Sequence, residues 1–250
     1  MFKVSSFEYR FRFFLHGIIY ALGFAVPWNY ALHLDPTGPN AHLWGLLAVQ
    51  LSRLGAGSIA AAFNVLLVIA IILATLGAWL RTWGSAYLGA NIVQSGSMHT
   101  AEAVPTTGIL QDGPFRHFRN PLYVGTVLHT LALAFLMPAS GAVFVIVMIV
   151  LVQARLILAE EAFLTEKLGA PYTAYCALVP RVLPTLRPRI AGSGLKPRWP
   201  QALLGEIYMV SVAGSFLVAG WSYDSGLLMK CVIVSLGVSI VARAFEPRTP

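Results

Sequence analysis

Residues 121–159 read PLYVGTVLHTLALAFLMPASGAVFVIVMIVLVQARLILA, two apolar runs that meet at the short stretch Pro138 to Ser140. A helix needs about 17 to 25 apolar residues to cross a bilayer, and each run lies near or within that range. Because the link between them is so short, the two helices must lie side by side. The stretch therefore predicts a hairpin of two membrane helices, over 121–137 and 141–159.

The rest of the chain has the same character. Of its 250 residues, 57% are hydrophobic and 11% are charged, and the mean hydropathy is +0.72. This composition excludes an ordinary soluble domain, and unbroken apolar runs favour helices over a β-barrel. We expect an all-α, polytopic helical membrane protein with about six transmembrane helices; the other four spans are 11–32, 58–80, 203–221 and 227–243.

Two apolar stretches need a separate interpretation. Residues 43–54 are too few to cross a bilayer, so we expect an interfacial or re-entrant helix there. The first span follows basic residues, as a signal peptide would, but it is long and lacks a small-x-small cleavage site. We expect it to be retained as the first membrane helix.

Basic residues predict the orientation of the chain. With the N-terminus in the cytoplasm, fourteen of the 17 Lys and Arg fall in cytoplasmic segments, Arg53 and Lys230 fall outside, and Arg155 lies within the fourth span. Cytoplasmic loops carry such an excess, so both termini are expected in the cytoplasm. The net charge of +7 then reflects a surface that faces lipid headgroups, and no nucleic-acid partner is expected.

The two cysteines and the scattered histidines do not have the spacing of metal ligands, so no metal site is expected. His129 is expected to be a hydrogen-bonded packing residue. Glu206 is expected to pair with a loop arginine or to lie at the interface.

Two long cytoplasmic segments, 81–120 and 160–202, flank the hairpin and emerge on the same face. Binding residues concentrate on such segments, so we expect the functional site there. This pattern divides the chain into N-terminal helices (1–80), a core (81–202) and C-terminal helices (203–250).

The candidate site residues lie where the hairpin meets these segments. Asn120 followed by Pro121 is typical of a helix N-terminus, whose free amide groups favour an anionic or polar ligand. Glu160 and Glu161 mark the point where the fourth span leaves the bilayer, and adjacent helical residues point about 100° apart. We expect Glu160 to face a ligand and Glu161 to face the loop.

Three further residues of this region have open or weaker interpretations. Arg155 lies deeper in the fourth span, where ionisable residues are usually functional, although a snorkelling side chain is the alternative. Tyr175 is expected to be an interfacial anchor, and the role of Tyr172 stays open.

The motifs GPFRHFRNPLYVG (113–125) and EEAFLTEKLGAPYTAYCALVPRVLP (160–184), separated by the hairpin, resemble the isoprenylcysteine carboxyl methyltransferase family and its relatives, the phospholipid N-methyltransferases. The resemblance covers about residues 81–186. The chain departs from the family pattern in three places. Asn120 replaces the usual His, Leu168 replaces a Phe, and Arg155 lies five residues before Glu160 where the family has an arginine about one turn before.

The resemblance implies an integral membrane methyltransferase with S-adenosylmethionine in a cytosolic pocket beside the hairpin and an acceptor that enters from the bilayer. It assigns catalytic roles to Arg155 and Glu160. It also implies cofactor contacts by two groups of residues: Asn120, Pro121, Leu122, Tyr123 and Glu160, and, mapped less directly, Gln94, Thr107, Gly108, Ile109, Leu110 and Phe115.

The acceptor stays open at this point. A carboxylate of a lipophilic, isoprenylcysteine-like acceptor needs no general base, whereas a phospholipid or other lipid amine must first lose a proton. Functions of another class are a sterol-reductase-like enzyme that uses NADPH and a transporter or scaffold without activity. Binding of S-adenosylmethionine, of a nicotinamide cofactor or of neither would distinguish these functions.

Overall fold

The computed structural model describes residues 11–25, 42–88 and 109–244, and the regular elements in these ranges are helices. This confirms the all-α prediction. The helices are α2 (Arg12–Ala25), α4 (Leu43–Arg53), α5 (Ile59–Leu88), η3 (Gly113–Arg116), α7 (Pro121–Ala134), α8 (Ala139–Leu168), α9 (Ala170–Leu178), α10 (Trp199–Gly205), α11 (Ile207–Ala219), η4 (Gly220–Ser222) and α12 (Ser225–Ala244).

The count of six spans stays a prediction. Among the described residues, α5, α8 and α12 are long and apolar enough to cross a membrane, and α10 with α11 makes a fourth candidate that is bent by 73°. The helices α2 and α7 have 14 residues each. At 1.5 Å per residue α7 reaches about 21 Å, short of a hydrocarbon core of about 30 Å, whereas the part of the first predicted span after Ala25 lies outside the described residues.

The predicted hairpin is formed by α7 and α8, which pack against each other. Its turn lies earlier than expected. The N–H groups of residues 135–137 donate to carbonyls three residues back, so the α-helix ends before them, and α8 begins at Ala139. The N-terminus of α4 is attached to this turn, since Leu43 N–H donates to Met137 O (2.8 Å) and Trp44 N–H to Phe135 O (3.1 Å). The segment predicted as interfacial or re-entrant is therefore a helix that packs on α5; its place relative to a membrane stays a prediction.

Glycines allow α5 and α7 to approach closely. A Cβ atom built on Gly77 would lie 2.8 Å from Gly125 O, and one built on Gly125 would lie 2.8 Å from Gly77 O. Small residues at such a crossing permit backbone contact between apolar helices. The antiparallel pair brings the C-terminal end of α5 to the N-terminal end of α7.

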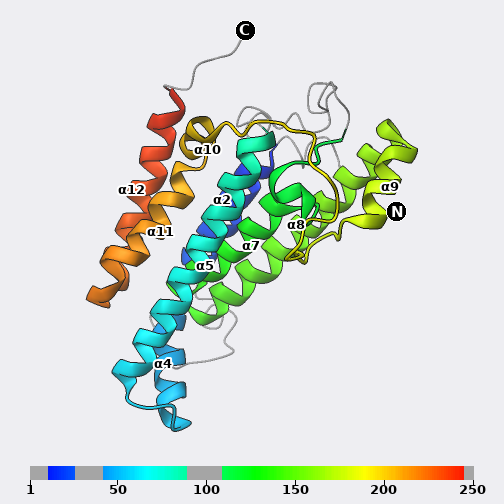
Figure 1. Ribbon diagram of the computed structural model, residues 1–250. Helices are drawn as coiled ribbons and strands as arrows, with labels where there is room; N and C mark the ends of the chain where they lie inside the picture. The colour runs from blue at the N-terminus through cyan, green and yellow to red at the C-terminus, as the bar shows by residue number, and fades with distance from the viewer. Residues whose placement is uncertain (1–10, 26–41, 89–108, 245–250) are drawn as a thin grey trace.

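Figure 1 shows α11 and α12 on one side of α5, with α7, α8 and α2 on the other. The end of α5, the start of α7 and the end of α8 lie at the same end of the bundle, which also carries η3, α9 and α10. We call this the site end. At the opposite end, α4 and the first half of α5 extend beyond the other helices.

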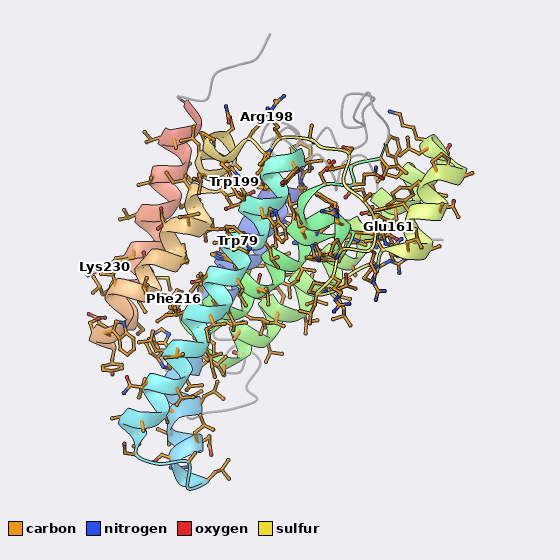
Figure 2. The ribbon with its side chains drawn as sticks, in the orientation of Figure 1. Trp79, Glu161, Arg198, Trp199, Phe216 and Lys230 are labelled. Atoms are coloured by element: carbon orange, nitrogen blue, oxygen red, sulfur yellow. The ribbon has the colours of Figure 1, made fainter. Side chains whose placement is uncertain are left out.

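A buried ion pair joins the C-terminal helices to α5. Arg81 Nε and Nη2 donate to the two carboxylate oxygens of Glu206 at 2.7 and 2.8 Å, and Ser85 donates to Glu206 Oε1 at 2.9 Å. Glu206 lies at the bend between α10 and α11. It pairs with an arginine as expected, but this arginine lies in a helix because α5 continues to Leu88. Trp79 of α5 stacks on Trp199 of α10 with ring centroids 5.7 Å apart (Figure 2).

His129 is buried, and its ring meets the Tyr208 ring edge-on at 5.3 Å. The packing role is as predicted, but the expected hydrogen bond is absent, since neither ring nitrogen has a partner among the described residues. The proposed division of the chain at residues 80 and 202 stays a prediction.

Candidate active site

A cavity lies at the site end, between the loop before α7, the end of α8 and helix α9. It encloses about 490 Å³, its open mouth included. The residues that line it are Ile109, Leu110, Phe115, Arg119, Asn120, Glu160, Glu161, Leu164, Leu168, Tyr172 and Tyr175.

The two adjacent glutamates of α8 have different partners. Tyr123 of α7 donates its hydroxyl to Glu160 Oε2 at 2.7 Å. Glu161 is buried and accepts hydrogen bonds from Asn120 Nδ2 (3.1 Å) and Arg181 Nε (3.0 Å). Arg119 Nε lies 3.5 Å from Glu161 Oε1. Glu161 thus fixes the surrounding loops, whereas Glu160 is tied to the first turn of α7.

Asn120 occupies the N-cap position of α7, as its sequence position predicts, but its side chain makes no capping hydrogen bond. The amide group instead donates to Glu161 and to the backbone carbonyl of Arg181 (3.0 Å). A hydrogen bond to a buried carboxylate is stronger than one to a neutral acceptor, which explains this choice. The amide groups of the first turn of α7 are left without a side-chain cap.

Helix α9 begins directly after Gly169, whose φ of +61° ends α8. Tyr172 and Tyr175 are buried, and the Tyr175 hydroxyl donates to Phe115 O at 2.8 Å. Burial raises the pKa of both phenols above their ordinary value, so both hydroxyls stay protonated donors. Tyr175 is therefore part of the cavity wall and not the interfacial anchor that the sequence suggested.

The segment 179–198, here called the strap, runs from α9 to α10 across the site end. It hydrogen-bonds the backbone of the loop before α7: Thr185 N–H donates to His117 O at 3.2 Å, Arg189 N–H to Arg116 O at 2.9 Å, and Arg119 N–H to Pro180 O at 2.9 Å. The hydrogen bond to Glu161 raises the pKa of Arg181, which stays a cation. The strap thus holds one wall of the cavity in place. Figure 2 shows Glu161 where α8 meets these segments.

Many of the residues assigned by resemblance meet in this structure. The cavity is lined by Ile109, Leu110, Phe115, Asn120 and Glu160, and Pro121, Leu122 and Tyr123 form the first turn of α7 beside it. Gln94, Thr107 and Gly108 lie outside the described residues. Arg155 is exposed on α8 and does not line the cavity, so the structure does not bring it together with Glu160. Its catalytic role stays a prediction.

Other lining residues were not proposed from the sequence. Leu164 and Leu168 follow Glu160 at spacings of four and eight along α8, so the helical period alone places them on the same face. Arg119 is the neighbour of Asn120, which is a weaker signal. No group of three metal-ligating side chains occurs in the described ranges.

Comparison with known proteins identifies one family. Residues 65–170 match the family model described as phospholipid methyltransferase. No curated protein and no solved structure matches the chain. The matched segment contains most of α5, the hairpin and the glutamate pair, and it ends at the start of α9. This match confirms the resemblance that the two motifs indicated. Over residues 65–170, which are under half of its length, the chain is thus similar to the phospholipid methyltransferase family, and this similarity indicates a membrane methyltransferase.

Proposed function

We propose that the protein transfers a methyl group from S-adenosylmethionine to a carboxylate of a lipophilic, isoprenylcysteine-like acceptor, at the cytoplasmic face of a membrane. The observation that carries this proposal is the position of Glu160. Its carboxylate lies on the wall of the cavity, is held by Tyr123 and stands next to the uncapped N-terminus of α7.

The residues of the cavity fit S-adenosylmethionine. An α-ammonium group needs a carboxylate, and Glu160, which lines the cavity and accepts a hydrogen bond from Tyr123, provides one. An α-carboxylate suits the free amides at the start of α7, with Arg119 beside them. The apolar side chains of Ile109, Leu110, Phe115, Leu164 and Leu168 suit an adenine ring.

In this reaction the protein mainly has to position the two reactants. When bound, the cofactor supplies a methyl group activated by an adjacent sulfonium. The residues of the cavity then have to align the acceptor and exclude water, and orientation alone accounts for a large part of the rate in such displacements. The strap and α9 serve this purpose, because α9 lines the cavity and the two segments fix Phe115 and Glu161.

A carboxylate acceptor agrees best with the hydrogen bonds of the site. Such an acceptor needs no general base. Glu161 is already bound by Asn120 and Arg181, and Glu160 by Tyr123 and, in this proposal, by the cofactor. Neither lining glutamate is then left to accept a proton. In this proposal Arg155, on the exposed face of α8, meets the acceptor as it approaches from the lipid.

A second acceptor class is the amine of a phospholipid, which the description of the matching family favours. An amine must lose its proton before it attacks, so Glu160 would then act as the base and not as the partner of the cofactor ammonium. The two acceptor classes therefore assign different roles to the same carboxylate.

Calorimetry on the detergent-purified protein tests the cofactor. We expect saturable binding of S-adenosylmethionine that is lost or strongly weakened in Glu160→Ala. Glu166→Ala is the matched control, because Glu166 is an exposed glutamate of the same helix. A folded parent that binds no S-adenosylmethionine would refute the proposal, and binding of a nicotinamide cofactor instead would favour the reductase alternative.

The product of a reaction with membrane extracts and methyl-labelled cofactor distinguishes the acceptors. A methyl ester releases volatile methanol at alkaline pH, whereas an N-methyl group does not. Label that is released by base supports the carboxylate acceptor, and label that resists base supports the amine.

A further inference from the structure

A second hollow lies on the other side of α9 from the cavity. This open groove runs between the end of α9 and the strap and encloses about 610 Å³, its open side included. Its walls are mixed: apolar residues that include Leu178, Leu183 and Pro184 line it together with Thr185 and Arg189, and polar and apolar atoms contribute about equally to its exposed surface. Tyr172 and Tyr175 face the cavity, so α9 separates the two hollows.

The strap that forms one wall of the groove is strongly basic. Between residues 179 and 198 it carries five cations and no acidic residue: Arg181, Arg187, Arg189, Lys196 and Arg198. Arg181 is engaged by Glu161. The side chains of the other four are exposed, and within the described ranges none of them has an ion-pair partner. This surface therefore suits an anionic ligand.

The same strap exposes large aliphatic side chains. Leu183 is 78% exposed and Leu186 fully exposed, and both lie outside any helix, between Arg181 and Arg187. Leu178, at the end of α9, is 59% exposed and adjoins Leu183 in the groove. Apolar side chains bordered by cations are typical of surfaces that contact lipid headgroups and the acyl region below them.

We propose that the groove and the strap bind an anionic membrane phospholipid, with its phosphate at Arg187 and Arg189 and an acyl chain along Leu178 and Leu183. The cations select for negative charge, since no acidic residue of the strap balances them. The exposed leucines select for an amphiphile and disfavour free phosphate. This site is distinct from that of the methyl acceptor and does not depend on the proposed methyl transfer.

Such a lipid would act on the candidate active site through the strap. The backbone bonds from Thr185 and Arg189 to the loop before α7 belong to the same few residues that line the groove. A bound lipid stabilises the position of these residues and, through them, the wall of the cavity.

Native mass spectrometry of the full chain in uncharged detergent tests this proposal, with phosphatidylglycerol, phosphatidylcholine and inorganic phosphate as probes. We expect retention of phosphatidylglycerol over phosphatidylcholine. Each cation near an anionic headgroup contributes about 1 kcal/mol, so Arg187→Gln with Arg189→Gln should lower that retention about thirtyfold. Arg53→Gln with Lys230→Gln is the control, which also removes two cations but from the end of the bundle where α4 and Lys230 lie (Figures 1 and 2).

Three outcomes would overturn the proposal. The first is equal retention of the two lipids by the parent, and the second is an equal loss in both double variants. The third is displacement of the lipid by inorganic phosphate alone. Leu183→Ser tests the apolar part separately: it should weaken retention of phosphatidylglycerol although every cation is kept. Thermal unfolding of each variant in the same detergent verifies that it is folded.

Discussion

Removing one partner of the Arg81–Glu206 ion pair should destabilise the protein more than removing both. Arg81→Met leaves the Glu206 carboxylate buried with Ser85 as its remaining donor among the described residues. Glu206→Leu leaves the guanidinium with Thr126 and the carbonyl of Leu122. Either single variant strands a charge in the contact between α5 and the bend of α10 and α11.

The magnitude follows from the bonds that are lost. Arg81 makes two charge-assisted hydrogen bonds to Glu206, at 2.7 and 2.8 Å, and each such bond contributes about 1.5 to 3 kcal/mol. Breaking a buried pair from one side typically costs about 3 to 5 kcal/mol, which agrees with that sum. Replacing both partners with apolar residues removes the stranded charge, so the double variant should lose only about 1 kcal/mol or less.

The free energy of unfolding in mixed detergent and dodecyl sulfate micelles measures this as a double-mutant cycle. From these magnitudes, the coupling energy between the two positions should be about 5 to 9 kcal/mol. Additive effects, or single variants that each cost less than about 1 kcal/mol, would show that the pair is hydrated and contributes little to the attachment of the C-terminal helices.

Three further predictions concern packing, charge and pH. Gly77→Ala should lower the free energy of unfolding by about 1 to 3 kcal/mol because its Cβ meets the backbone of α7, whereas Gly17→Ala, with open space around it, should cost nothing or stabilise α2 by up to about 1 kcal/mol; thermal unfolding compares them. Asn120→Asp places a second carboxylate beside Glu161 and should destabilise the protein at neutral pH but less so in acid, where a protonated Asp can donate in place of the amide; unfolding midpoints at the two pH values check this. Because burial raises the pKa of Tyr172 and Tyr175, the unfolded chain releases these protons first, so stability should fall as the pH rises above the ordinary value of 10.0, and Tyr172→Phe should reduce that fall.

Local signals in the sequence predicted the parts of the site that lie on the hairpin. Asn120 and Pro121 mark the start of α7, and Gly169 marks the end of α8. The short link makes the two helices antiparallel neighbours. The start of α7 and the end of α8 therefore lie side by side, which brings Tyr123 to Glu160. These inferences need only a helical period and a turn, so a single sequence was sufficient.

Contacts made by the strap could not be predicted in this way. Arg181 contacts Glu161, which lies 20 residues earlier in the sequence. Thr185 contacts His117, which lies 68 residues earlier. The strap has no helical or strand period, and its basic residues look like an ordinary cytoplasmic loop. A related limit applies to the ends of the spans: hydropathy gives the length of an apolar run, but not the point at which the backbone leaves the helix, as it does after Ala134.

The position of Arg155 on α8 does not bring it to the cavity beside Glu160. Five residues along a helix turn the side chain by about 500°, so Arg155 points about 140° away from Glu160, whereas a separation of four would bring the two within about 40°. The structure agrees, since Leu151 and Leu158 share the exposed face with Arg155, and Gln153 and Leu156 are buried on the other. An arginine on that face cannot line the cavity unless α8 rotates. Among the described residues, the arginine that lines the cavity is Arg119, whose Nε lies 3.5 Å from Glu161 Oε1.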